Sequence, residues 1–256
     1  MRGAGAGRLL IRFVGHATVL VAMDGVRLLT DPLLRRRVGP LRRVAPLDRD
    51  AARRVDAALV SHAHRDHLDP ASLRRLGAGR VVVPRGAAPM LRRRRIGPVT
   101  EVAPGDRVAV GPVEVLATPA DHGGSRGPLG PDALALGYAM LGSRRALFLG
   151  DTDLFPAMEG LVEDLDVLLV PIWGWGPTLG RGRHLDPARA AEAVRLLRPR
   201  VAIPIHWGTL LPAPLGLLRR PAFLSEPAEA FAAAVTRVAP EAEARILRPG
   251  EATTIG

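Results

Sequence analysis

The chain has 256 residues, 47% of them hydrophobic, and a mean hydropathy of +0.12. This composition is typical of a soluble globular protein that can bury the core of one α/β domain, and no apolar run reaches the roughly 18–20 residues that cross a bilayer. The absence of cysteine excludes disulfides, thiolate nucleophiles and Cys-liganded zinc, while the net charge of +11 suggests an anionic partner.

The first part of the chain is rich in short β runs. Asp24-Gly25 lies between two of them and is a dipeptide that two-residue hairpins favour. An Arg- and Pro-rich stretch, 35–49, predicts a surface loop. We expect strands at 9–14, 17–23, 26–30 and 57–60.

Later elements alternate more often between strand and helix. Asp69-Pro70 and Asp186-Pro187 each place a helix N-cap residue before a proline in the first helical position. This order of elements predicts an α/β fold, a four-layer αββα sandwich, with residues 1–256 as one domain. We expect helices at 70–76, 86–95, about 155–164, 187–198 and 227–238, strands at 81–83, within 99–118, and at 134–141, 145–149, 166–170, 201–205 and 244–248, and an apolar loop at 210–224.

Three histidines and an aspartate lie within six residues, directly after the strand at 57–60. They are His62, His64, Asp66 and His67. Imidazole nitrogen and carboxylate oxygen are ligands of Zn²⁺ and similar metals. A single histidine is most often a satisfied core residue, but three at this spacing are poorly explained in that way. The cluster therefore predicts a metal site.

Other candidate ligands also follow predicted strands. His122, Asp151 and His206 each come where a strand ends, so one edge of a sandwich can collect them beside the cluster. Two metals that each keep an open position need about seven protein ligands. His62, His64 and His122 would form one group, Asp66, His67 and His206 the other, and Asp151 could bridge them.

The His-x-His-x-Asp-His motif at 62–67 resembles the hallmark of the metallo-β-lactamase superfamily. The flanking motifs at 15–18, 30–32, 150–152 and 205–209 look like the branch of N-acylphosphatidylethanolamine phospholipase D and the ascorbate-phosphate lactonase. The resemblance implies the same ligand split, with Asp151 bridging two divalent ions, zinc first and manganese or iron as alternatives. The β-lactamase branch commonly uses a Cys ligand, which this chain lacks. The phospholipase and lactonase branch often has a Trp-Ser pair after the histidine that corresponds to His122, and here Gly123-Gly124 stand in its place.

A metal pair implies hydrolysis by a metal-bridging hydroxide that attacks a phosphorus or carbonyl centre. By analogy with the superfamily, Asp66 would orient the hydroxide. His184 matches a functionally important histidine of the phospholipase branch and would protonate the leaving oxygen, unless it only introduces the helix that follows. His16 and Asp31 are either partners behind the ligands or simple turn residues.

The substrate class stays open between three alternatives. We favour a phosphodiester, a phosphate-bearing small molecule or a phospholipid; the alternatives are a lactone, ester or thioester, and nuclease activity. Nucleic acid is less favoured because the arginines are dispersed and aromatic residues do not alternate with them.

The remaining expectations concern location and contacts. The N-terminus lacks a secretory apolar region, so we expect a cytoplasmic protein. The loop at 210–224 is a candidate for peripheral membrane contact, for burial or for contact within a homo-oligomer. Trp173, Trp175 and Trp207 would line the pocket mouth or pack in the core.

Overall fold

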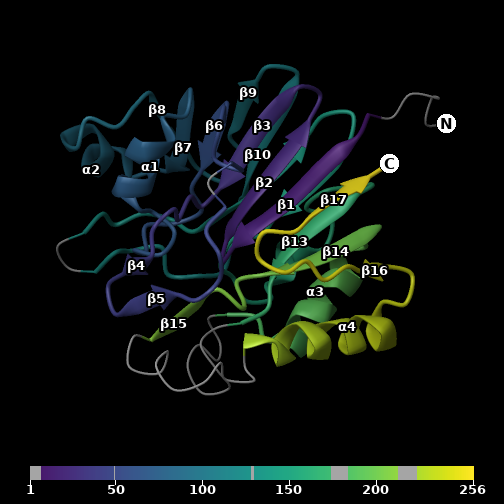
Figure 1. Cartoon of the computed structure of the whole chain (residues 1–256). Helices are drawn as coiled ribbons and strands as arrows, with labels where there is room; N and C mark the ends of the chain where they lie inside the picture. Colours follow the sequence, from purple (N-terminus) through teal and green to yellow (C-terminus); the bar gives the residue numbers. More distant parts are fainter. Residues whose placement is uncertain (1–6, 49, 128–129, 174–183, 213–223) are drawn as a thin grey trace.

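Two β-sheets face each other, with helices on their outer sides (Figure 1). The computed structural model describes residues 7–48, 50–127, 130–173, 184–212 and 224–256. Within this part of the chain, the strands form two seven-stranded sheets and one small three-stranded sheet.

The first sheet has the strand order β17-β1-β2-β3-β6-β7-β8. Its strands β17, β1, β2 and β3 pair antiparallel, and β3, β6, β7 and β8 pair parallel. The predicted hairpin at Asp24-Gly25 is confirmed, and both residues have positive φ, as a type I′ turn requires. The strands are β1 (Leu9–Gly15), β2 (Thr18–Met23), β3 (Val26–Thr30), β6 (Ala57–Leu59), β7 (Arg80–Pro84), β8 (Val99–Val102) and β17 (Ala252–Ile255).

The second sheet has the strand order β16-β14-β13-β12-β11-β10-β9. Strands β9 to β12 form an antiparallel meander, and β12, β13, β14 and β16 run parallel. The strands are β9 (Arg107–Val110), β10 (Val113–Pro119), β11 (Leu136–Leu141), β12 (Arg145–Phe148), β13 (Val167–Pro171), β14 (Val201–Ile205) and β16 (Glu243–Ala244).

The two Asp-Pro helix starts are confirmed. The Asp69 side chain accepts a hydrogen bond from the backbone N–H of Ser72, and Asp186 accepts one from Arg189 in the same way. The helices of the described residues are α1 (Pro70–Leu76), α2 (Ala88–Arg93), α3 (Pro187–Leu197) and α4 (Glu226–Val238).

Apolar side chains fill the space between the sheets and on both outer faces. One buried cluster joins the inner faces of both sheets to α3 and α4, and includes Phe13, Tyr138 and Phe231. A second cluster packs the outer face of the first sheet against α1 and α2, through Leu73 and Leu91. Helices therefore cover the outer side of each sheet, which confirms the αββα prediction.

The structure corrects several element predictions. The expected loop at 35–49 contains two short strands, β4 (Arg37–Val38) and β5 (Leu41–Arg43). Strand β5 pairs with β15 (Leu210–Pro212), which lies in the other predicted loop, 210–224. The buried Arg43 stabilises this pairing, because its guanidinium donates to the carbonyls of Val14 and Leu33. Residues 213–223 of that loop lie outside the described part of the chain.

Two more predictions were wrong. The helix expected at about 155–164 is only a single 3₁₀ turn, η1 (Pro156–Met158). The terminal strand expected at 244–248 ends at Ala244; the chain then turns at Gly250 and returns as β17 beside β1. This crossing to the other sheet is a long-range pairing that local sequence does not signal.

Among the described residues, no helix combines the length and apolar character that a membrane crossing requires.

Candidate metal centre

The predicted ligands converge from strands of both sheets. His62 follows β6 of the first sheet, while His122, Asp151 and His206 follow β10, β12 and β14 of the second. The carboxyl ends of these strands meet at one edge of the sandwich, where the loops after them carry the polar side chains.

Three imidazole nitrogens form the first group. His62 Nε2 lies 2.9 Å from His64 Nδ1, and His122 Nε2 lies 3.3 Å from the same atom. Ligand atoms bound tetrahedrally at about 2.0 Å from Zn²⁺ would lie about 3.3 Å apart. The geometry of His62, His64 and His122 therefore suits three nitrogen ligands of one cation.

Asp66, His67 and His206 form the second group, and Asp151 lies beside both groups. Asp151 Oδ2 is 3.3 Å from His67 Nε2 and 4.0 Å from His62 Nε2, and its Oδ1 is 3.3 Å from His206 Nε2. One carboxylate thus reaches ligand nitrogens of both groups. The structure brings together all seven residues that the sequence analysis selected.

Hydrogen bonds behind the rings set the direction in which the histidines point their lone pairs. His67 Nδ1 donates to Asp31 Oδ2 at 2.7 Å, and His206 Nδ1 donates to the Trp173 carbonyl at 2.7 Å. With Nδ1 as the donor, each ring directs Nε2 into the cluster, which is the orientation that a metal needs.

Ser61 extends the same arrangement to His62. Its hydroxyl donates to Asp31 Oδ2 at 2.6 Å and therefore accepts from His62 Nδ1, 2.9 Å away. The Ser61 backbone N–H also donates to Asp31 Oδ1 at 2.7 Å. Asp31 thus orients ligand rings of both groups, directly for His67 and through Ser61 for His62. Sequence analysis had named Asp31 as a possible partner and had missed Ser61.

Burial and charge agree with a cation at this position. His67 Nε2, His206 Nε2 and Asp151 Oδ1 are buried atoms without a hydrogen-bond partner in the described structure, which is costly unless another species binds them. Burial lowers the pKa of His67, but attraction to Asp151, Asp66 and Asp31 outweighs it and raises that pKa well above its ordinary value. The residues present therefore fit divalent metal ions.

His16 lies against the second group. Its Nε2 is 3.1 Å from Asp66 Oδ2, and burial lowers the pKa of His16 to about 3, so the neutral ring donates its Nε2–H to the carboxylate. His16 and His206 both adopt left-handed backbone conformations, with φ of 58° and 65°. This backbone conformation is uncommon for residues other than glycine and costs free energy. The contact role proposed for His16 agrees with this geometry.

His184 reaches the same cluster from the loop before α3. Its Nδ1 lies 3.5 Å from Asp151 Oδ2, and its ring centre lies 4.7 Å from that of His122. Burial lowers the pKa of His184 to about 4, with Asp151 opposing the shift. His184 thus faces the centre as an uncharged ring at neutral pH, and its catalytic role stays a prediction.

A glycine shapes the wall beside His122. A Cβ on Gly124 would lie 2.2 Å from the carbonyl oxygen of Ala133, so no larger residue fits without movement of the backbone. The Gly124 carbonyl also accepts a hydrogen bond from Ala63, inside the ligand loop. Gly124 therefore holds the loops of His64 and His122 close together.

The tryptophans divide between two environments. Trp207 is buried, donates its indole N–H to the Pro204 carbonyl and stacks on Phe13, so it belongs to the core. Trp173 contributes its carbonyl to His206 and is half-buried. Trp175 lies outside the described residues.

Comparison with known families agrees with this arrangement. A family profile described as "Beta-lactamase superfamily domain" matches residues 26–207, a segment that contains all seven candidate ligands. The chain belongs to the metallo-β-lactamase superfamily.

Relatives at about one-third identity have related names. A "UPF0173 metal-dependent hydrolase" from Methanopyrus kandleri is 31% identical over 249 residues, covering 94% of this chain and 97% of the relative. An "N-acyl-phosphatidylethanolamine-hydrolyzing phospholipase D 1" from Caenorhabditis elegans is 33% identical over 228 residues, covering 78% of this chain and 64% of the relative. This protein is a metal-dependent hydrolase of that superfamily.

A solved structure shares the fold across nearly the whole chain. A metallo hydrolase from Ignicoccus hospitalis superposes with a TM-score of 0.74 at 23% identity, covering 97% of this chain and 99% of that one. The αββα sandwich is therefore the metallo-β-lactamase fold.

Proposed function

We propose that this enzyme binds two divalent metal ions and hydrolyses a phosphodiester or another phosphate-bearing small molecule or lipid. The position of Asp151 supports the dinuclear site most directly, because its two oxygens face ligand nitrogens of both groups. The net charge of +11 and the phospholipase name of the worm relative support a phosphate-bearing substrate.

The ligands in this proposal are His62, His64 and His122 for one ion, Asp66, His67 and His206 for the other, and Asp151 for both. Zinc fits this set of donors, and manganese or iron would also be accepted. Bound divalent ions supply a nucleophilic water at neutral pH and neutralise charge on the substrate oxygens.

The protein side chains would orient and move protons around this centre. Asp66 accepts the His16 Nε2–H through Oδ2, which fixes the carboxylate and leaves Oδ1 to orient the attacking water. His184 is uncharged at rest, so its ring nitrogen can take a proton during attack and return it to the leaving oxygen. Its Nδ1 lies 3.5 Å from Asp151 Oδ2, which supports this role.

The decisive experiment joins metal analysis to a substrate panel. We expect two ions per chain in the purified protein, turnover of bis(p-nitrophenyl) phosphate that a chelator abolishes, and loss of both turnover and one ion in His64→Ala. Arg92→Gln, an exposed change on α2, serves as the control. Unchanged turnover in His64→Ala would contradict the proposal.

The same panel separates the alternative substrates. Lactones, carboxylic esters and thioesters measured beside phosphodiesters identify the preferred class by kcat/KM. Faster turnover of a lactone or thioester would reassign the substrate while leaving the metal centre intact. Membrane contact, oligomeric state and cytoplasmic location stay predictions, testable by vesicle binding, sedimentation and fractionation.

A further inference from the structure

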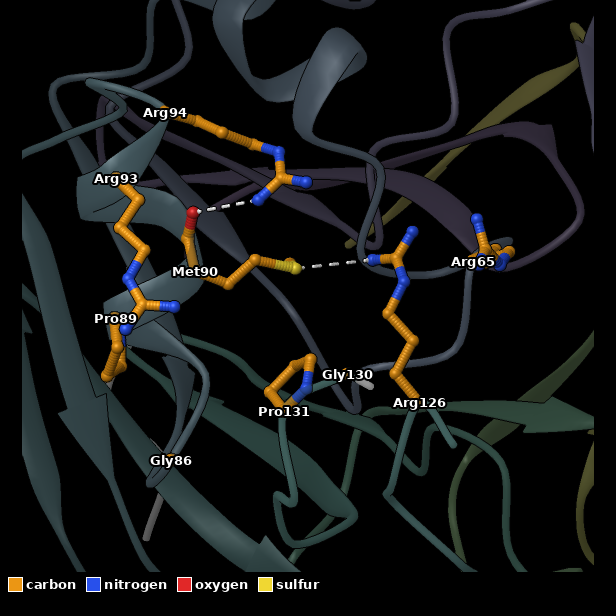
Figure 2. A pocket seen from close by; sticks show the side chains of 9 residues that line it. All are labelled: Arg65, Gly86, Pro89, Met90, Arg93, Arg94, Arg126, Gly130 and Pro131. Atoms are coloured by element: carbon orange, nitrogen blue, oxygen red, sulfur yellow. Dashed lines mark hydrogen bonds between the residues drawn. The ribbon is translucent and has the colours of Figure 1, made fainter. Parts of the chain in front are cut away.

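Arginines line a cavity that reaches Arg65, the residue between the candidate ligands His64 and Asp66 (Figure 2). Its volume is about 590 Å³, within the range of small-molecule sites. Arg65, Arg93, Arg94 and Arg126 line it, and Met90 and Pro131 supply part of its wall. None of its lining residues is acidic. We call this cavity the arginine pocket.

The pocket is built on the loops that carry the candidate ligands. Arg65 lies between His64 and Asp66, and Arg126 lies four residues after His122. Arg126 Nη1 donates to the Leu68 carbonyl at 2.9 Å, which ties this side chain to the ligand loop itself. The opposite side belongs to α2 and the residue after it, from which Arg93 and Arg94 extend (Figure 2).

The guanidinium groups bring positive charge together without a direct carboxylate partner. In the described part of the chain, none of the four arginines is in a salt bridge with a carboxylate. Among the described residues, the Arg94 guanidinium donates to the Met90 carbonyl, and the Arg126 guanidinium donates to the Leu68 carbonyl and the Met90 sulfur. Burial and then repulsion from Arg65 and Arg94 lower the pKa of Arg126, and attraction to Asp69 and Asp66 only partly opposes this shift. Like charges repel one another, and a bound anion would offset this repulsion.

The shape and chemistry of the pocket favour phosphate as the anion. Several guanidinium groups directed into one space can match the three free oxygens of a phosphate group with paired hydrogen bonds. A nucleic-acid strand would need aromatic side chains for its bases to stack on, and none lines the cavity.

We propose that the arginine pocket binds a second, non-reacting phosphate group of the substrate and thereby positions the scissile bond at the metal centre. This inference rests on the proposed phosphate chemistry and names its substrate class: a molecule with a phosphate group besides the one that is hydrolysed. That group is carried either by a soluble metabolite or by a phospholipid head group. Arg65 links the two sites, because it is part of the ligand loop and of the pocket.

Binding of inorganic phosphate to the full-length, metal-loaded protein tests the pocket directly. Titration calorimetry at low ionic strength should show two classes of site in the wild type, one at the metals and one at the arginines. Arg93→Gln and Arg126→Gln should weaken the second class by about tenfold or more, since each removes a charged donor. Arg92→Gln, one residue away and also exposed on α2, lies outside the cavity and should bind as the wild type does. Equal binding in Arg92→Gln and Arg93→Gln would overturn the inference.

Kinetics and vesicles provide two further readouts. For a phosphodiester that bears an additional terminal phosphate, Arg93→Gln should raise KM about tenfold and leave kcat unchanged, whereas KM for bis(p-nitrophenyl) phosphate should not change. If Arg93→Gln abolishes binding to vesicles of phosphatidic acid in phosphatidylcholine, the second phosphate group belongs to a lipid. If Arg93→Gln weakens the binding of inorganic phosphate and the wild type does not bind the vesicles, the group belongs to a soluble metabolite.

The outcomes separate this inference from the proposed function. If no phosphodiester is hydrolysed, the proposed function fails, and the calorimetric comparison still decides whether the pocket binds phosphate. If single-stranded DNA binds through Arg93 while inorganic phosphate does not, the pocket serves nucleic acid and the inference fails. Thermal melting of each variant checks that it folds, which is expected because Arg92 and Arg93 are both exposed.

Discussion

The Asp31 carboxylate holds the His67 ring through a 2.7 Å hydrogen bond between Oδ2 and Nδ1, and both side chains are fully buried. The same carboxylate accepts from the Ser61 hydroxyl and backbone N–H. Asp31 itself adopts a left-handed backbone with φ of 32° directly after β3. One residue that binds no metal in the proposed arrangement thus positions ligands of both ions.

Asp31→Asn should weaken metal binding by about 10–100-fold, because the amide cannot accept from His67 and Ser61 with the strength of a carboxylate. Competition with a calibrated chelator measures the affinity of each ion. Asp48→Asn is the matched control, since Asp48 pairs with Arg12 at the surface, outside the centre. Equal affinities in the two variants would show that the hydrogen bond to His67 does not set the geometry of the ligands.

His184→Gln should lower kcat by about 10²–10⁴-fold while the metal content stays at the wild-type value. The physical reason is the loss of a ring nitrogen that exchanges a proton with water or the leaving oxygen. Steady-state kinetics and metal analysis on the same sample distinguish this role from metal binding. Loss of an ion in His184→Gln would instead make His184 a ligand, because its Nδ1 lies 3.5 Å from Asp151 Oδ2.

Gly124→Ala should destabilise the protein by about 1–3 kcal/mol, because the added methyl would meet the Ala133 carbonyl at 2.2 Å and force the backbone apart. Gly123→Ala is the neighbouring control: its Cβ would meet nothing within 4 Å, so the free energy of unfolding should change by less than about 0.5 kcal/mol. Urea denaturation measures both. Equal destabilisation would refute the close approach at Gly124.

Asp166→Asn should cost about 2–3 kcal/mol at neutral pH, because Asp166 is buried and accepts hydrogen bonds from the Arg144 and Arg200 guanidiniums and the Arg145 backbone. Burial opposes the charge, but these donors outweigh it and lower the pKa of Asp166. A carboxyl with a lowered folded-state pKa stabilises the protein at pH values above its unfolded-state pKa, which is about 3.9. This contribution is lost as the pH falls through the folded-state pKa.

The pH dependence gives this prediction a second check. The difference in unfolding free energy between wild type and Asp166→Asn should be constant from about pH 7 to 5 and shrink below about pH 4. Asp164→Asn, in an exposed ion pair with Arg145, should differ little from wild type throughout. A difference that grows on acidification would contradict the assigned ionisation.

The sequence by itself determined which residues form the candidate metal centre and that they follow strands. Ligand chemistry resides in side-chain type and local spacing, so His62, His64, Asp66 and His67 were recognisable without coordinates. His122, Asp151 and His206 were recognisable because each ends a strand. The helix starts at Asp69-Pro70 and Asp186-Pro187 are equally local, since an N-cap bonds to the backbone three residues later.

Only the tertiary structure decided which residues hydrogen-bond to those ligands and which charged side chains gather near them. The Ser61–Asp31 contact, the return of β17 to β1 and the gathering of Arg65 and Arg126 opposite Arg93 all join segments far apart in sequence. Such contacts depend on how the two sheets pack and on which polar groups are buried together. Neither is encoded in the local periodicity or spacing of the sequence. For Arg65, its place between two candidate ligands was visible in the sequence, and the arginine pocket that it lines became visible only in the fold.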